Sequence, residues 1–305
     1  MKQILFISII VLLALNGLAK SRELYMTTSD NVTLYVKVSG HGKPCVFIHG
    51  GPGSNSYYYE AMASSALIEK EVEMIYYDQR GCGRSSSPAN GDYSLKRMEK
   101  DLEEIRIFLG YKKWMLMAHS FGGVIQTAYA SDYPEQVMSL LYIHCTLNMN
   151  YSLQSHIDFG IQALGISDPK PYTDSSKPVG ERLSAIHQQL TEKGIWYKLM
   201  YRNPWEKTYN DTIDNPIKPN NRDFANTVWN IRDYWADFTA ASKLIKAPVL
   251  VMTGIKDYAI GPEHYKQFQF PDQKIVRYIG GHAPFQEEPQ WYAEKIISFV
   301  QQLKN

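Results

Sequence analysis

The sequence predicts an α/β fold with a mostly parallel central sheet that is flanked by helices. Short apolar runs of strand length alternate with amphipathic stretches of helix length along most of the chain, an order typical of parallel sheets. Two corners between a strand and a helix carry glycine-containing motifs, His49-Gly50-Gly51-Pro52-Gly53 and Ala118-His119-Ser120-Phe121-Gly122. From about residue 148 to residue 240 the alternation stops, which predicts a mainly helical cap inserted after the sixth strand.

The strands are predicted from apolar runs and from one alternating pair. Residues 23–28 and 32–39 alternate around Ser29, Asp30 and Asn31, residue types that favour turns, so we expect an antiparallel hairpin there. The runs that predict the other strands are residues 44–48, 73–77, 113–118, 138–144, 248–254 and 274–279.

Three helices of the core are predicted from periodicity and end signals. Residues 94–109 stop at Gly110, residues 121–133 close against Pro134, and the last helix opens at Glu288-Pro289. The apolar residues expected to face inward are Leu95, Met98, Leu102, Ile105 and Phe108 in the first of these helices, and Tyr292, Ile296, Phe299 and Leu303 in the last.

Ser120 is the predicted nucleophile. Its surroundings fit the G-x-S-x-G elbow, in which a strained turn between strand and helix exposes the serine oxygen, with Ala118 in place of the first glycine. The motif alone also fits a serine that caps a helix. The acid and the base follow in the chain order that this fold uses. The acid is Asp257, in the loop after the strand at 248–254, and the base is His282, after the strand at 274–279. The rival acid position, after residues 138–144, offers no carboxylate.

Four motifs together resemble the proline iminopeptidase (prolyl aminopeptidase) branch of the α/β-hydrolase superfamily, peptidase family S33. They are His49-Gly50-Gly51-Pro52-Gly53, Asp78-Gln79-Arg80-Gly81-Cys82-Gly83-Arg84-Ser85, the serine elbow, and Gly281-His282-Ala283-Pro284-Phe285-Gln286-Glu287. The resemblance is dense over about residues 23–147 and 243–303 and thin between them. It implies an α/β-hydrolase core at 20–147 and 241–305 and a cap at 148–240 that selects the substrate.

The resemblance further implies removal of an N-terminal residue, usually proline, from a short peptide whose free amine is held by acidic side chains. In some relatives one such acid directly follows the catalytic aspartate, but Tyr258 stands at that place. Within the cap, Glu206 and Asp223 are the carboxylates that we expect could bind the ammonium group, with a solvated surface position as the alternative for each.

The oxyanion hole is predicted to consist of the backbone N–H groups of Gly51 and Phe121, because an acyl-transfer intermediate needs two preorganised donors. His49 is interpreted as structural, held against loop backbone. Arg80 and Arg84 are expected to fix loops through carboxylates or carbonyls. His119 is assigned no role.

Composition limits the function classes. The chain has 305 residues and a net charge of +1, which gives no electrostatic reason for nucleic-acid binding. The three cysteines, Cys45, Cys82 and Cys145, are expected to be small core residues rather than a disulfide framework. A signal peptide is predicted at residues 1–19, from Lys2, the apolar run at residues 4–15 and the small residues up to Ala19. Cleavage is expected after Ala19. The protein is therefore expected to be secreted or periplasmic, without a stable membrane anchor.

We therefore expect a serine hydrolase in which His282 takes the proton of Ser120 while Asp257 orients the imidazole. No metal or organic cofactor is expected, since metalloprotease and phosphate-loop motifs are absent from the sequence. The partner is a short peptide or another small acyl substrate. An esterase, lactonase or carbon–carbon bond hydrolase with the same triad is the alternative, and a non-catalytic small-molecule binding protein is a more remote one.

Overall fold

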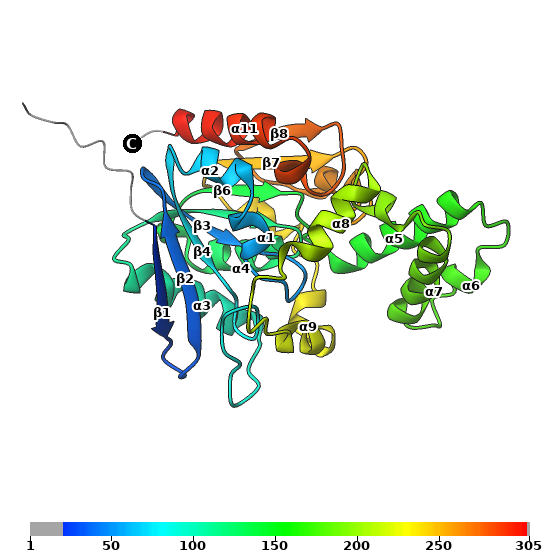
Figure 1. Cartoon of the computed structure of the whole chain (residues 1–305), viewed down its shortest axis with the longest axis horizontal. Coiled ribbons are helices and arrows are strands. Elements are labelled where there is room, and N and C mark those ends of the chain that lie inside the picture. Colours follow the sequence, from blue (N-terminus) through cyan, green and yellow to red (C-terminus); the bar gives the residue numbers. More distant parts are fainter. Residues whose placement is uncertain (1–20, 304–305) are drawn as a thin grey trace, which may run out of the picture.

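A single eight-stranded sheet forms the centre of the computed structural model, which describes residues 21–303 (Figure 1). The strand order is β1-β2-β4-β3-β5-β6-β7-β8, with β1 and β2 antiparallel to their neighbours and all other pairs parallel. The strands are β1 (Arg22–Thr27), β2 (Thr33–Ser39), β3 (Lys43–Ile48), β4 (Val72–Tyr77), β5 (Trp114–His119), β6 (Val137–Ile143), β7 (Val249–Gly254) and β8 (Gln273–Tyr278). The predicted α/β-hydrolase architecture is confirmed.

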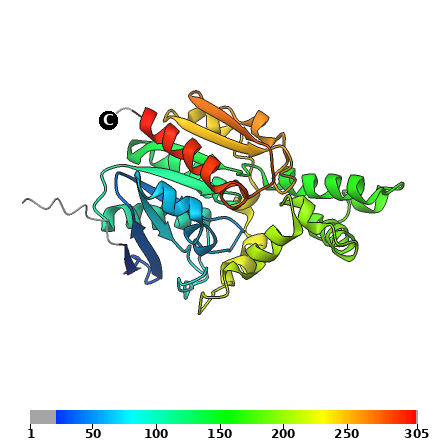
Figure 2. The same ribbon diagram turned by 45° about the horizontal axis from the view of Figure 1, so that its top comes forward.

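Helices cover both faces of this sheet (Figures 1 and 2). The core helices are α1 (Tyr57–Glu60), α2 (Ala63–Ile68), α3 (Leu95–Phe108), α4 (Gly122–Asp132), α10 (Pro284–Glu287) and α11 (Pro289–Gln302). Along β5, Leu116 and Ala118 belong to the core that includes α3 and α4, whereas Met115 and Met117 belong to the core that includes α2 and α11. Successive side chains point to opposite faces of a strand, so the continuous apolar run of β5 is the signature of a strand buried on both sides.

The inward face of α3 is predicted correctly except at its end. Ser94 caps the helix by accepting a hydrogen bond from the Arg97 N–H, and Leu95, Met98, Leu102 and Ile105 are buried. Phe108 was expected to face inward, but its side chain is 53% exposed. Phe108 is the last helical residue, and the chain turns away at Gly110 with φ +78°, so the neighbouring Leu109 packs against the core instead.

The mainly helical insertion expected after the sixth strand lies between β6 and β7. Its helices are α5 (Met149–Leu164), α6 (Lys170–Thr173), α7 (Val179–Glu192), α8 (Pro204–Ile213) and α9 (Asp223–Thr227), joined by short 3-10 turns. α5, α6 and α7 project away from the sheet as an arm (Figures 1 and 2). The arm has a small core of its own around Ile157, Ile186 and Leu190. The exact limits of the cap, 148 and 240, stay a prediction.

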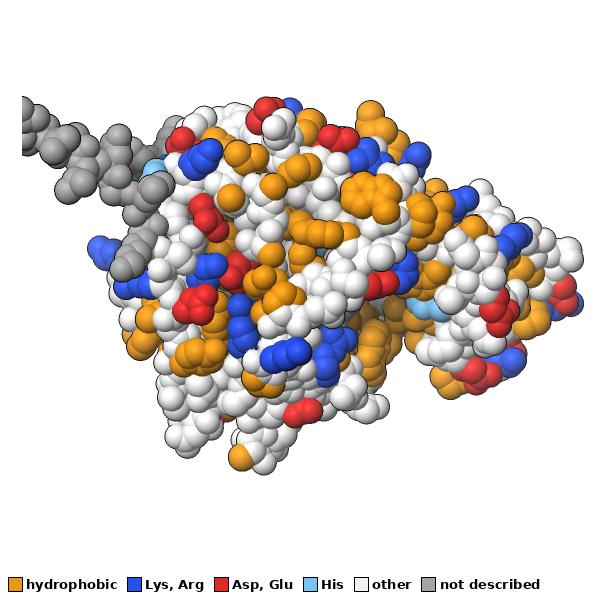
Figure 3. Space-filling view, in the orientation of Figure 1, with side chains coloured by type: hydrophobic (Ala, Val, Ile, Leu, Met, Phe, Trp, Pro, Cys, Tyr) orange, Lys and Arg blue, Asp and Glu red, His pale blue; other side chains and the backbone are white. Residues whose placement is uncertain are grey.

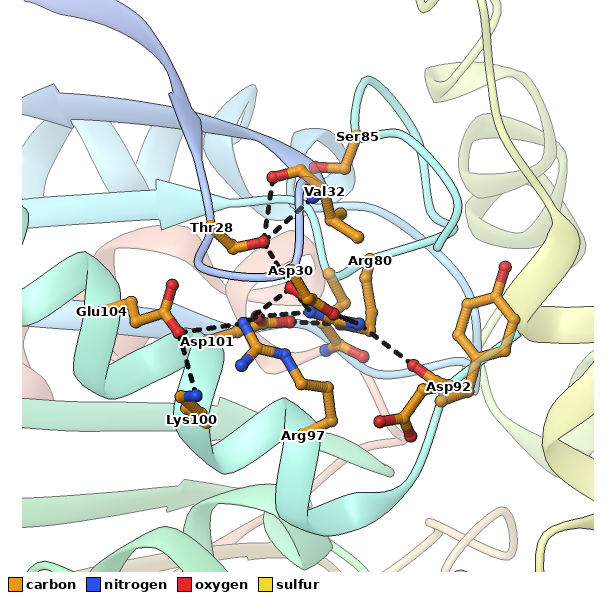
Figure 4. A network of polar contacts seen from close by, with 12 residues as sticks. Thr28, Asp30, Val32, Arg80, Ser85, Asp92, Arg97, Lys100, Asp101 and Glu104 are labelled. Atoms are coloured by element: carbon orange, nitrogen blue, oxygen red, sulfur yellow. Dashed lines mark hydrogen bonds and ion pairs between the residues drawn. The ribbon is translucent and has the colours of Figure 1, made fainter. Parts of the chain in front are cut away.

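A buried ion network fixes the loop after β4 against the first hairpin (Figure 4). The guanidinium of Arg80 is fully buried and donates through Nε and Nη2 to the two oxygens of Asp101, at 2.6 and 2.8 Å. It also reaches Asp30 in the hairpin turn at 2.9 Å. Arg84 in the same loop donates to the Asp78 carboxylate at 2.7 Å. The loop-fixing role expected for both arginines is therefore confirmed.

Three further expectations concern cysteines and the membrane. Cys45, Cys82 and Cys145 are buried and unpaired, as predicted. Within residues 21–303, no helix combines the length and the apolar character that a bilayer crossing needs. The predicted signal peptide, residues 1–19, lies outside the described residues.

Candidate active site

Ser120 stands at a strained turn between β5 and α4. Its φ is +55°, a left-handed conformation that is uncommon for a residue with a side chain. The end of β6 braces this turn, because the Ser120 N–H donates to the carbonyls of Ile143 and His144 at 3.2 and 3.1 Å, and the Thr146 N–H donates to the Ser120 carbonyl at 3.1 Å. The turn has the geometry that a nucleophile elbow requires.

Glycines allow three backbone segments to meet at this elbow. A Cβ atom at Gly50 would lie 2.7 Å from the Ser120 Cβ, and one at Gly122 would lie 2.3 Å from the Ile48 carbonyl oxygen. Any side chain at either position would push the loop after β3 away from Ser120. The two glycine-containing corners recognised in the sequence therefore form one site.

Asp257 and His282 form a buried hydrogen-bonded pair beside the elbow. His282 Nδ1 lies 3.0 and 2.9 Å from the two carboxylate oxygens of Asp257, and both side chains are almost completely buried. Burial alone would raise the pKa of Asp257, but the imidazoles of His282 and His144 outweigh it and hold this pKa well below its ordinary value. An ionised Asp257 accepts the Nδ1–H of His282 and leaves Nε2 free to accept a proton. His282 and Ser120 line the same cavity.

His144 is a third member of this cluster that the sequence analysis did not identify. It is the residue directly after β6, and its Nδ1 lies 2.8 Å from Asp257 Oδ2. Each residue of this cluster also offers one atom that could bind a metal ion. These atoms, from His144, Asp257 and His282, all lie within 4.8 Å of one another. Hydrogen bonds among these same atoms account for the short separations.

His119 also contributes to the site, although no role was assigned to it. Its Nε2 lies 3.0 Å from the carbonyl oxygen of His282, which can only accept, so Nε2 carries the proton. Burial lowers the pKa of His119 well below its ordinary value, and in the neutral ring Nδ1 then accepts from the Tyr58 hydroxyl at 2.8 Å. The Gly50 N–H donates to the same hydroxyl at 3.1 Å. This chain connects the loop after β3 with the loop that carries His282.

The two predicted oxyanion donors lie beside the nucleophile. Gly51 lines the cavity next to Ser120 with φ +123°, and Phe121 follows Ser120 at the start of α4. Among the hydrogen bonds of residues 21–303, none uses the N–H of Gly51 or Phe121. Gly51 lines the cavity, whereas Phe121 is not among its lining residues, and the assignment of these two N–H groups as the oxyanion hole stays a prediction. His49 is structural as expected, since its buried Nε2 accepts from the Gln79 N–H at 3.0 Å.

The cavity beside Ser120 has a volume of about 130 Å³. Its walls come from the elbow, from the loops after β3 and β8, and from the cap; they are Gly51, Ser54, Tyr58, His119, Ser120, Met200, Tyr201, Asn210, Asp214, His282, Ala283 and Phe285. A cavity of roughly 150 Å³ holds one benzene molecule, so this one accommodates a single small ring or side chain. A larger cavity of about 720 Å³ lies at the opposite ends of the strands, around Lys43 and Val249, and contains no member of the cluster.

One carboxylate, Asp214, faces this cavity. Asp214 follows the last residue of α8, and Asn210 one turn earlier also lines the cavity. Asn55 donates to Asp214 Oδ2 at 2.9 Å, while Oδ1 is buried without a hydrogen-bond partner in the described residues. Burial raises the pKa of Asp214, and the hydrogen bond from Asn55 opposes this only in part. The site therefore holds an acceptor that a cationic donor would satisfy.

Neither acid predicted for the substrate amine lines the cavity. Glu206 is buried in the first turn of α8, where its Oε2 accepts from the Asn203 N–H at 3.0 Å in a capping box. Asp223 is exposed at the start of α9 and accepts from the Ser87 hydroxyl at 2.5 Å. Tyr258 stacks on Phe159 at 4.4 Å between ring centroids. Amine binding by Glu206 or Asp223 stays a prediction without a contact that supports it.

Comparisons with known proteins agree with this architecture. A family model described as alpha/beta hydrolase fold matches residues 43–289. A proline iminopeptidase of Xylella fastidiosa (strain 9a5c) is 30% identical over 185 residues, which are 59% of this chain and 58% of that relative. The match thus spans less than two thirds of the relative's length. The AB hydrolase superfamily protein YisY of Bacillus subtilis (strain 168) is 25% identical over 92% of this chain and 98% of its own.

Solved structures give the same fold. A proline iminopeptidase-related protein from Thermus thermophilus has a TM-score of 0.75 at 19% identity, covering 93% of this chain and 98% of its own. An enol-lactonase from Burkholderia xenovorans has a TM-score of 0.67 at 15% identity, covering 92% of this chain and 100% of its own. At these identities the similarity establishes the architecture only. With the matches above, the predicted resemblance to the proline iminopeptidase branch is confirmed.

Proposed function

We propose a function for this chain, which belongs to the alpha/beta hydrolase fold family. It is a serine aminopeptidase that releases one N-terminal residue, preferably proline, from short peptides. The observation that carries the proposal is the cavity beside Ser120, which has room for one small ring and contains the carboxylate of Asp214. The similarity to proline iminopeptidases supports it.

The size of the cavity favours a single residue over a long acyl chain. At about 130 Å³ it is smaller than the roughly 300–1,000 Å³ typical of drug-sized ligand sites. A five-membered pyrrolidine ring fits between the apolar side chains of Tyr58, Met200 and Phe285. The secondary ammonium of an N-terminal proline would then donate to Asp214 Oδ1, which has no other partner in the described residues.

In the proposed mechanism each residue of the cluster has one role. His282 Nε2 takes the proton of Ser120 Oγ as Oγ attacks the carbonyl carbon of the first residue, and Asp257 stabilises the imidazolium. The N–H groups of Gly51 and Phe121 bind the developing oxyanion. The C–N bond breaks as His282 gives its proton to the leaving amine, and water then hydrolyses the acyl-enzyme by the reverse proton transfers.

Hydrolysis of a prolyl arylamide with a free amine, compared with its N-acetylated analogue, tests this proposal. We expect only the free-amine compound to be cleaved, and Ser120→Ala to lower kcat by about 10⁴-fold or more. Asp214→Asn should raise KM for the free-amine compound by about 10- to 100-fold, because a charge-assisted hydrogen bond contributes about 1.5–3 kcal/mol. Asp211→Asn, on the exposed side of α8, is the matched control.

An esterase or lactonase with the same triad is the second candidate. The cavity wall within residues 21–303 holds one carboxylate rather than a pair, and Met200, Ala283 and Phe285 offer apolar surface to a small acyl group. Ser120-dependent cleavage of a nitrophenyl ester, without cleavage of either arylamide, would favour this candidate and exclude the aminopeptidase.

We also propose export from the cytoplasm, on the basis of the sequence of residues 1–19. Expression of the full chain in a bacterial host should yield a mature protein that begins at Lys20. Intact mass measurement of the purified protein tests this, and retention of Met1 would contradict it.

A further inference from the structure

His144 is a buried titratable group of the site that the mechanism above does not use. Its side chain has no exposed surface, and its Nδ1 lies 2.8 Å from Asp257 Oδ2. His282 Nδ1 lies 2.9 Å from the same oxygen. Asp257 therefore accepts from two imidazoles, one directly after β6 and one in the loop after β8.

The proton positions in this cluster are fixed by the carboxylate. An ionised Asp257 can only accept, so His144 must carry its proton on Nδ1. Burial lowers the pKa of His144, and the hydrogen bond with Asp257 opposes this only in part, so the ring is neutral. His144 Nε2 is then a bare nitrogen, which agrees with its having no hydrogen-bond partner in the described residues.

The fold provides a specific place for this ring. His144 has φ +48°, a left-handed conformation at the end of β6 that is uncommon for a histidine. Gly254 at the end of β7 leaves the space that the ring needs, since a Cβ there would lie 2.7 Å from His144 Cε1. The ends of two neighbouring strands thus place a hydrogen-bond donor beside the Asp257 carboxylate.

Within the described residues, Asp257 Oδ2 accepts from His144 and from His282. Without His144, it would keep only the hydrogen bond from His282. The remaining partners are His282 itself and the N–H groups of Ala259 and Ile260, which donate to Oδ1 at 3.2 and 3.4 Å. Among the described residues His282 would then be the single donor to Oδ2, and this oxygen could take up water. The tautomer and the orientation of His282 depend on this carboxylate.

We infer that His144 is a positioning residue of the catalytic cluster: by donating Nδ1–H to Asp257 Oδ2 it fixes the carboxylate that orients His282. The inference rests on the proposed triad but not on the peptide substrate. His144 also shares the negative charge of Asp257, so it sets how strongly that charge stabilises the imidazolium of His282.

Other titratable groups near His282 are His119, Glu287 and, from α5, His156, whose pKa is lowered to about 4 by burial. His119 packs on its ring, with centroids 4.6 Å apart, and is held neutral by burial. Glu287 lies in α10, just after the loop that carries His282, and its Oε2 accepts from the Gly281 N–H and the Tyr278 hydroxyl. Removal of the donor at position 144 concentrates the charge of Asp257 on His282, and the acid limb of the activity profile should respond.

Two variants at position 144 test this inference with a Ser120-dependent substrate of either class, arylamide or nitrophenyl ester. His144→Leu should lower kcat by about 10- to 100-fold with KM within about twofold, and should move the acid limb of the kcat/KM profile up by about half a pH unit. His144→Asn retains a donor at the position of Nδ1 and should recover most of both effects. A purely structural histidine would lower stability without moving the acid limb.

The outcomes are separable. If His144→Leu keeps the wild-type kcat and acid limb, or if folded His144→Asn is as impaired as His144→Leu, the inference is wrong. If His144→Leu does not fold, nitrogen-15 NMR of the wild-type histidines decides. We expect the ring assigned to His144 to carry its proton on Nδ1 and not to titrate between about pH 6 and 9. The rings of His49 and His264 should look alike, because their Nε2 atoms accept from backbone N–H groups, so the signal must be assigned to His144 before it counts. A proton on Nε2 of His144, or titration of His144 in this range, would overturn the inference. Activity that persists in Ser120→Ala would contradict the proposed triad instead.

Discussion

Two buried carboxylates, Asp101 in α3 and Asp257 after β7, accept hydrogen bonds from different kinds of donor. Asp101 accepts from the guanidiniums of Arg80 and Arg97, which are permanently charged (Figure 4). Asp257 accepts from two imidazoles. A guanidinium compensates the charge at all times, whereas a neutral imidazole leaves most of the charge on the carboxylate.

The difference separates a structural cluster from a chemical one. Burial raises the pKa of Asp101, and the guanidiniums of Arg80 and Arg97 oppose this only in part, while the Arg80 guanidinium holds the pKa of the more exposed Asp30 well below its usual range. In this network each carboxylate is paired with a cation in the resting protein. The charge of Asp257 instead is shared by two imidazoles and is not paired with a permanent cation, and in the proposed mechanism this charge stabilises the imidazolium of His282. The expected effects of substitution therefore divide between stability and catalysis.

Substitution of the two aspartates should give the largest contrast. Asp257→Asn should lower kcat by about 10⁴-fold, because an amide can hold His282 in the wrong tautomer. Asp101→Asn should leave kcat of the folded protein within about threefold of wild type, since the cavity wall is built from other residues. Steady-state kinetics on both variants checks this. Comparable losses of kcat would mean that the two clusters are not functionally distinct.

Removal of the buried cation should show the reverse pattern. Arg80→Met leaves Asp101 and Asp30 without their main partner, and we expect a loss of about 3–5 kcal/mol in the free energy of unfolding. Lys100→Met, which removes an ion pair of 3.9 Å with a half-exposed lysine, should cost less than about 0.5 kcal/mol. Urea denaturation of both variants measures the difference. Equal stabilities would show that burial of the Arg80 network contributes nothing.

Glu99 offers a smaller test, because it is a buried carboxylate without a dedicated cation. Burial and the neighbouring Asp132 raise its pKa to about 8, and only the exposed Lys96 opposes them. Since the folded pKa lies above the unfolded value of 4.5, the favourable contribution is complete below about pH 4.5 and is lost as pH rises through 8.

Between pH 6 and pH 9 the free energy of unfolding of the wild type should therefore fall by about 1 kcal/mol more than that of Glu99→Gln. This figure allows for solvent screening. Denaturation at both pH values measures this. Glu135→Gln, at a position 87% exposed, is the control and should behave like wild type. A pH dependence unchanged by Glu99→Gln would show that Glu99 ionises normally.

Outside these clusters, basic and acidic side chains lie among apolar ones on the face seen in Figure 3, without a large patch of a single sign. This agrees with the near-neutral net charge of +1. The charges on which the predictions above depend are the buried ones.

The sequence by itself determined the sheet, the elbow and the order of Ser120, Asp257 and His282. These features depend on local signals, since strand-length apolar runs, glycines at corners and capping residues act over a few neighbouring positions. Strand ends of a parallel sheet gather at one edge, so the placement of the three residues after strands was enough to bring them together.

Only the tertiary structure decided which side chains complete the site. His144 meets Asp257 across 113 positions of sequence, and no local pattern marks that contact. In α8, the sequence favoured Glu206, but that residue caps the helix, and Asp214 at the other end faces the cavity. Whether a polar side chain turns inward depends on the packing of distant segments against it, and periodicity within one helix carries no information about that packing.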